Sequence, residues 1–229
     1  MRYVIAAHTA TAPPGLWRVG RASDPYSTKP PEPINDTDIR GGNRFDSAAG
    51  TYRVLYFATH QEACFGETLA AMRPNLKMRA LVEEEWKRKG FMLVGTIPAD
   101  WRHKRLLVNA HVDGVFFDIE EHSSRTYLEH QAALANILAN YDVAHLDVPT
   151  VRGRDRRITR HISQWIHDHT KPDGTPTYAG IRYLSRLDTD WECWAVFDRT
   201  AVTETQRYAI SARHPALKRI TTRWEILIR

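Results

Sequence analysis

The chain has 229 residues, 42% of them hydrophobic, which is enough for one buried core and too apolar for a disordered tail. No run of about 18 apolar residues is long enough to cross a membrane, and the apolar segment 1–8 is too short for a signal peptide. These features predict a cytoplasmic protein. The net charge of +5 favours an anionic partner, either a nucleic acid or a small phosphate-bearing ligand.

The first third of the chain contains a strand, a loop and a second strand. A strand is expected at Leu16–Arg21, followed by an extended Pro-rich loop at 29–33 and a turn at Gly41-Gly42-Asn43. The short apolar run 53–58 predicts a buried strand. This part of the chain therefore alternates strands with irregular segments.

A helix should follow the second strand. Thr59 and Glu62 have the spacing of a capping box, with the threonine as N-cap. The helix is expected from about His60 to Met72 and should end before Pro74.

Further strands and helices are predicted without regular βαβ alternation. Helices are expected at Ser124–Ala139 and Asp155–Asp168. Strands are expected at 91–97, 105–108, 115–119, 180–185, 193–197 and 224–228. This mixture favours an α+β fold around a mixed or mainly antiparallel sheet with flanking helices. The sequence lacks both Gly-x-Gly-x-x-Gly and Gly-Lys-Ser/Thr, the two commonest nucleotide-binding turns.

Glu67 is the most informative polar residue of the expected helix. Its helical neighbours are Ala63, Ala70 and Ala71, a small-residue face suited to close packing on a sheet. A carboxylate there should be partly desolvated and in need of a partner. The alternative is a glutamate at the rim of an amphipathic helix.

Two arginines are candidates for phosphate binding. Arg44 follows the glycine turn, where the backbone can approach a ligand closely, and its planar guanidinium matches a phosphate. Arg18 lies inside a strand between apolar neighbours, as an edge charge or as an inward-facing ligand. The dense basic cluster at 152–160 is expected to be a solvated helix start.

Ser185 ends a predicted strand and shares a strand face with Ile181 and Tyr183. It has no Gly-x-Ser-x-Gly setting, which argues against a serine hydrolase. The histidines form no metal-binding motif, and Cys64 and Cys193 lack ligand spacing and should be buried thiols.

In chain order these pieces resemble the RES domain, a family named for an Arg, a Glu and a Ser. The matching segments are 41–46, 55–58, 63–69 and the run Gly180-Ile181-Arg182-Tyr183-Leu184-Ser185-Arg186. Trp17-Arg18-Val19 resembles the family's opening motif. The resemblance covers roughly residues 15 to 200. Departures are Asn43, which interrupts the usual Gly-Gly-Arg, and Phe45-Asp46 in place of Trp-Asn.

The resemblance implies one domain over residues 1–229 with an ADP-ribosyltransferase-like fold, and an enzyme that consumes NAD⁺ by phosphorolysis or hydrolysis. Several members are toxins paired with a helix-turn-helix antitoxin. The sequence has no obvious helix-turn-helix, so an antitoxin would be a separate chain. NAD⁺ would be a substrate, inorganic phosphate a possible co-substrate, and neither a cofactor nor a metal is expected.

The resemblance also implies roles for individual residues. Glu67, Arg44 and Ser185 are the expected catalytic residues. The residues expected to bind NAD⁺ are Arg18, Tyr56 and Tyr183. All of these side chains should therefore converge on one cleft, and a doubly wound parallel sheet would contradict the resemblance.

Three alternatives stay open at this stage. The first is transfer of ADP-ribose to a macromolecule. The second is a basic nucleic-acid-binding module, whose affinity would fall steeply with salt, although no recognition helix or interleaved aromatic surface is evident. The third is a non-catalytic relative that binds a partner. The acceptor of the ADP-ribosyl group and the oligomeric state cannot be predicted from the sequence.

Overall fold

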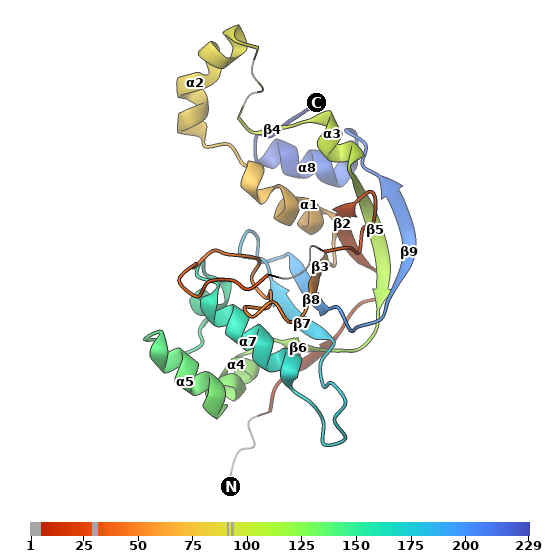
Figure 1. Ribbon diagram of the computed structural model, residues 1–229. Helices are drawn as coiled ribbons and strands as arrows, with labels where there is room; N and C mark the ends of the chain where they lie inside the picture. Colours follow the sequence, from red (N-terminus) through yellow and green to blue (C-terminus); the bar gives the residue numbers. More distant parts are fainter. Residues whose placement is uncertain (1–5, 29–31, 91, 93) are drawn as a thin grey trace.

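The computed structural model describes residues 6–28, 32–90, 92 and 94–229 (Figure 1). The expectations for the first five residues and for positions 29–31 of the Pro-rich loop lie outside the described residues. So do positions 91 and 93 of the strand expected at 91–97.

Among the described residues, one large sheet has eight strands in the order β1-β6-β7-β8-β3-β2-β5-β9. Neighbouring strands are antiparallel throughout, except for the parallel pair β6 and β7. The strands are β1 Thr9–Thr11, β2 Leu16–Arg21, β3 Val54–Ala58, β5 Arg105–Val112, β6 Val115–Asp118, β7 Gly180–Leu184, β8 Glu192–Phe197 and β9 Val202–Ala209. A short parallel pair consists of β4 Thr96–Ile97 and β10 Leu227–Ile228. The predicted α+β fold with a mainly antiparallel sheet is therefore confirmed.

The helices form two groups at different parts of the curled sheet (Figure 1). Helices α4, α5 and α7 gather beside β6 and β7, whereas α1 and α8 lie together near β2; α2 extends away from the body. The helices are α1 Gln61–Leu69, α2 Leu76–Arg88, α3 Ala99–His103, α4 His122–Glu129, α5 Ala132–Asn140, α6 Val148–Arg152, α7 Arg157–Asp168 and α8 Pro215–Arg223. Within the described ranges, no helix has the length and apolar character needed to cross a bilayer.

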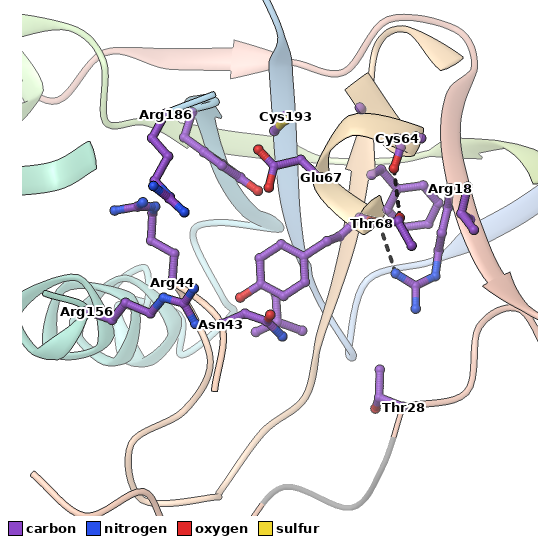
Figure 2. A pocket seen from close by; sticks show the side chains of 16 residues that line it. Arg18, Thr28, Asn43, Arg44, Cys64, Glu67, Thr68, Arg156, Arg186 and Cys193 are labelled. Atoms are coloured by element: carbon purple, nitrogen blue, oxygen red, sulfur yellow. Dashed lines mark hydrogen bonds between the residues drawn. The ribbon is translucent and has the colours of Figure 1, made fainter. Parts of the chain in front are cut away.

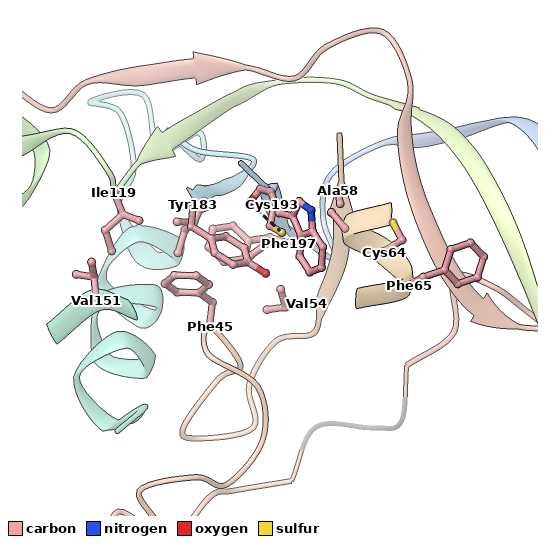
Figure 3. Close-up of a cluster of buried hydrophobic side chains, with 14 of the residues drawn as sticks. Phe45, Val54, Ala58, Cys64, Phe65, Ile119, Val151, Tyr183, Cys193 and Phe197 are labelled. Atoms are coloured by element: carbon pink, nitrogen blue, oxygen red, sulfur yellow. Dashed lines mark hydrogen bonds between the residues drawn. The ribbon is translucent and has the colours of Figure 1, made fainter. Parts of the chain in front are cut away.

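The central strands are buried on both faces. Along β8, Cys193 and Phe197 belong to the main apolar cluster, and Trp194 and Val196 belong to a smaller cluster on the opposite face. Figure 3 shows the main cluster continuing from β8 to Phe45 of the loop that precedes β3. Burial on both faces explains why these strands read as continuous apolar runs.

Several local expectations were wrong. Thr59 does not cap α1, because its hydroxyl donates to Glu192 Oε2 at 2.6 Å and His60 is the N-cap residue. The single helix expected over Ser124–Ala139 is two helices, α4 and α5, which are separated at Gln131. The strand expected at 224–228 is limited to β10, since Trp224 closes α8.

Strand β9 was not expected because it lies at the edge of the sheet with mostly exposed side chains. Its polar composition follows from that exposure and carries no buried alternation for a sequence pattern to detect. Helix α2 also lacked a signal, since none of its residues is buried.

Candidate active site

A cleft of about 310 Å³ opens between α1, the strands β2 and β3, and the loop that precedes β3. Its lining residues are Arg18, Val19, Thr28, Asn43, Arg44, Val54, Tyr56, Phe57, Ala58, Cys64, Glu67, Thr68, Arg156, Tyr183, Arg186 and Cys193. The predicted site residues thus converge, and Ser185 contacts the cleft through Glu67. In Figure 2, Glu67 lies between Arg18 on one side and the group of Arg44, Arg156 and Arg186 on the other.

Glu67 reaches the cleft because α1 packs tightly against the loop between β7 and β8. Gly66 makes this approach possible: an added Cβ would lie 2.1 Å from a ring carbon of Trp191. The next residue, Glu67, then accepts a hydrogen bond from the Ser185 hydroxyl. Glu67 is exposed to the cleft, so the expected partial desolvation of this carboxylate was wrong, whereas the expected hydrogen-bonded partner is present.

Ser185 is a buried residue with three bonds that fix its position. Its amide donates to Trp191 O at 2.8 Å, and its hydroxyl accepts from the amide of Leu187 at 3.0 Å. Because that hydroxyl oxygen already has a donor, its own proton is directed to Glu67. The side chain does not itself line the cleft, so its place is behind the carboxylate.

Arg44 is tied to the main chain of another segment. Its two terminal nitrogens donate to Val151 O at 2.7 Å and to Arg152 O at 3.0 Å. Burial lowers the pKa of Arg44, although a guanidinium stays protonated in proteins. The side chain therefore brings positive charge to the cleft and also joins its loop to α6.

Arg18 likewise donates hydrogen bonds to two main-chain carbonyls. Its Nε donates to Pro25 O at 2.8 Å and its Nη1 to Tyr56 O at 3.0 Å. Burial lowers the pKa of this arginine as well. Of the two positions that the sequence left open, the inward-facing one is observed, since Arg18 lines the cleft.

The two tyrosines of the cleft are held by the protein. The Tyr56 hydroxyl donates to Asp46 Oδ1 at 2.8 Å and accepts from the amide of Phe45 at 3.0 Å. Tyr183 packs edge-on against Phe45, with ring centroids 5.0 Å apart. Burial raises the pKa of both phenols, so neither is a base near neutral pH.

Both cysteines are buried, as predicted, and both line the cleft. The thiol of Cys64 donates to Trp17 O at 2.8 Å, and burial raises its pKa to about 12. Burial also raises the pKa of Cys193. A thiol is nucleophilic only as the thiolate, so these pKa values argue against cysteine chemistry at neutral pH.

The expectation that the basic cluster at 152–160 is a solvated helix start was wrong for Arg156 and Arg160, whereas Arg154 is exposed. Arg160 is 1% exposed and donates to Gly41 O and Asp38 O, both at 2.8 Å. Arg156 donates to Arg40 O at 3.1 Å and to Gly42 O. These arginines fasten the loop that carries Arg44 onto α7. Their i, i+4 spacing, which places them on one helix face, was the available signal.

Arg156 and Arg186 both line the cleft, although neither was predicted as a site residue. Arg186 was visible in the sequence as the last residue of the run that begins at Gly180, but no role followed from the pattern alone.

One group among the described residues has a geometry that could hold a cation. Ligand atoms of His8, Asp118 and Glu121 lie within 4.8 Å of one another. Asp118 is already paired with Arg182 at 3.2 Å, and none of the three residues lines the cleft. This group is therefore separate from the candidate active site.

Comparison with known proteins gives one family. The sequence model of the RES domain matches residues 15–219. Among solved structures, a chain of the M. tuberculosis MbcT-MbcA toxin-antitoxin complex is similar, with 13% identity and a TM-score of 0.45, over 90% of this chain and 86% of that chain. No curated protein matches the sequence.

Proposed function

The chain belongs to the RES-domain family, and we propose that it is an enzyme that cleaves the nicotinamide–ribose bond of NAD⁺, with NAD⁺ as substrate and not as a recycled cofactor. One observation carries the proposal. Glu67 places an exposed carboxylate in a cleft whose other charged lining residues are four arginines. Such a cleft suits a molecule that has a diphosphate and a sugar on which positive charge develops.

The proposed chemistry follows from the leaving group. Nicotinamide departs as a neutral amine, and the ribose passes through a state that resembles an oxocarbenium ion, as in glycoside cleavage. The Glu67 carboxylate would stabilise this charge or hold a ribose hydroxyl. Oε1 of Glu67 is bound by Ser185, and no described residue binds Oε2. One oxygen thus orients the group while the other is available to the substrate.

The remaining roles are assigned by chemistry and position. Arg18 and Arg44 would contact the diphosphate, because a guanidinium has five N–H donors and each of these arginines uses only two of its nitrogens within the protein. The rings of Tyr56 and Tyr183 would form the surface that the nicotinamide riboside half contacts. Ser185 would act as a positioning residue through Glu67.

We also propose a biological setting from the family alone. The enzyme would be a cytoplasmic toxin that is neutralised by a separate helix-turn-helix antitoxin chain. Duplex DNA should bind only weakly, and that binding should weaken as salt is added. A sequence-specific DNA complex that persists at about 200 mM salt would favour the nucleic-acid-binding alternative instead.

The test is product identification with purified protein and NAD⁺, in the presence and absence of inorganic phosphate. Free nicotinamide with ADP-ribose indicates hydrolysis, and nicotinamide with a phosphorylated ADP-ribose indicates phosphorolysis. ADP-ribose attached to a protein or nucleic acid would indicate the transferase alternative. Unchanged NAD⁺, with no partner covering the cleft, would reject the enzyme function.

Glu67→Gln tests the catalytic assignment. Glutamine keeps the shape and one acceptor oxygen but loses the charge, so the rate should fall about 10²–10³-fold while the protein stays folded. Glu84→Gln is the matched control, since Glu84 is an exposed glutamate of the protruding helix α2. A folded Glu67→Gln enzyme that is as active as Glu84→Gln would disprove the role of Glu67.

A further inference from the structure

The four arginines of the cleft do not have equal freedom. Arg18, Arg44 and Arg156 each donate to two main-chain carbonyls. A ligand that pulled one of these guanidinium groups toward itself would leave those carbonyls without their donors. The cost is greatest for Arg18 and Arg44, whose hydrogen bonds are partly buried, and smaller for Arg156, whose hydrogen bonds are exposed. These three side chains are therefore restricted by the fold that they support.

Arg186 is different. It is exposed, and its side chain makes neither a hydrogen bond nor an ion pair with any other described residue. Its backbone, in contrast, is fixed between two anchored positions. Ser185 is bonded to Trp191 and Glu67, and Leu187 donates its amide to the Ser185 hydroxyl. A firmly placed backbone with an unengaged guanidinium is suited to ligand binding, because no protein contact has to break.

The electrostatic surroundings of Arg186 favour an anion. Figure 2 shows the guanidinium groups of Arg186 and Arg44 facing each other at one side of the cleft. Burial lowers the pKa of Arg44, and the nearby positive charge of Arg186 contributes in the same direction. Glu67 is the one carboxylate among the described lining residues, and Ser185 already binds it. A phosphate between the two guanidinium groups would relieve their repulsion.

We propose that Arg186 is the principal phosphate-binding residue of this cleft and that Arg44 assists it from a fixed position. The inference rests on the proposed function and deepens it by naming the group that recognises the substrate's phosphate. Two sources supply that chemistry: the diphosphate of the dinucleotide, or free phosphate as the attacking co-substrate. The adjacency of Arg186 to Ser185, and through it to Glu67, puts either one beside the reacting sugar.

The decisive experiment measures binding without turnover. ADP-ribose and inorganic phosphate are titrated by calorimetry into the parent protein, Arg186→Gln and Arg213→Gln. Arg213 is the matched control, because it is an exposed arginine outside the cleft. Loss of one charge-assisted hydrogen-bonding group should weaken binding roughly tenfold or more in Arg186→Gln. The control should bind like the parent, and both variants should keep the parent's melting temperature.

Titration with ADP-ribose and with inorganic phosphate distinguishes the two possible sources of the bound phosphate. A loss confined to ADP-ribose assigns Arg186 to the diphosphate, with a raised KM for NAD⁺ and a nearly unchanged kcat. A loss confined to inorganic phosphate assigns it to the co-substrate, with a higher half-saturating phosphate concentration. Equal binding of both ligands by parent and Arg186→Gln would overturn the inference. If binding depends on Arg186 but NAD⁺ stays intact, the inference stands and the proposed function fails.

Discussion

The two sides of the cleft hold charge in opposite ways. On the α1 side, the Glu67 carboxylate is exposed, and one hydroxyl from Ser185 orients it. On the α7 side, Arg44, Arg156 and Arg160 are engaged with main-chain carbonyls. The first side presents its charge to a ligand, and the second uses most of its charge to fix the chain.

The difference shows why a count of cationic residues overestimates the number of side chains that are available to bind a ligand. The loop that carries Arg44 has no helix or strand of its own in the described residues, so its carbonyls need donors from elsewhere. Arg156 at the N-cap of α7 and Arg160 within α7 supply these donors and take part in positioning the loop. A basic composition thus reflects folding demands as well as ligand binding, and substitutions should separate the two uses.

The largest expected effect is on the α7 side of the cleft, where arginines fix the chain. Arg160→Met should lower the free energy of unfolding by about 2–3 kcal/mol, because the buried Arg160 side chain no longer donates to the partly buried Gly41 O and Asp38 O. Removal of a buried charge offsets part of that cost. Denaturant unfolding measures the change, and the KM for NAD⁺ should rise as the loop carrying Arg44 loosens.

The control for this substitution is Arg154→Met, at an exposed position of the same basic cluster. It should change stability by less than about 0.5 kcal/mol. Equal stability of the Arg160 and Arg154 variants would show that the buried arginine does not fasten the loop.

The next effect tests the other side of the cleft. Ser185→Ala removes the hydrogen bond that orients Glu67, so kcat should fall about tenfold, with little change in KM. If Ser185 had only a structural role, Ser185→Ala would cause the same loss of kcat in a protein that already carries Glu67→Gln. We expect instead that Ser185→Ala adds little to Glu67→Gln, which a double-mutant cycle measures. If the effects of the two substitutions on kcat were fully additive, Ser185 would not act through Glu67.

Much of the sheet was predictable from the sequence, because its central strands have strong apolar patterns. Strand β2 was predicted with its observed ends at Leu16 and Arg21, and β3 and β8 were placed within one residue. Edge strand β9 and helix α2 contain no buried residue, so neither has a buried face for a sequence pattern to detect. Thr59 had the spacing of a cap but found a stronger partner, the Glu192 carboxylate, which is distant in sequence.

The sequence predicted five of the residues that line the cleft but not the contacts that these residues make. The order of motifs identified Arg18, Arg44, Tyr56, Glu67 and Tyr183, and all five line the cleft. Which arginine is free to bind a ligand depends on carbonyls that lie about one hundred residues away in sequence, such as that of Val151 for Arg44. A local sequence pattern does not predict contacts between residues so far apart. For the same reason it did not predict that Arg156 and Arg186 line the cleft.

The smallest expected effect concerns Tyr56, which lies on β3 and supports the loop that carries Arg44. Tyr56→Phe leaves the Phe45 amide and Asp46 Oδ1 without their shared partner. The free energy of unfolding should fall by about 1 kcal/mol. Because the ring remains in the cleft, kcat should be almost unchanged, whereas the KM for NAD⁺ should rise a few-fold as Arg44 loses its fixed position. Tyr208→Phe, at an exposed tyrosine of β9, should match the parent in both measurements. A large loss of kcat in Tyr56→Phe would instead mean that this hydroxyl acts on the substrate directly, and the division between the two sides of the cleft would then not hold.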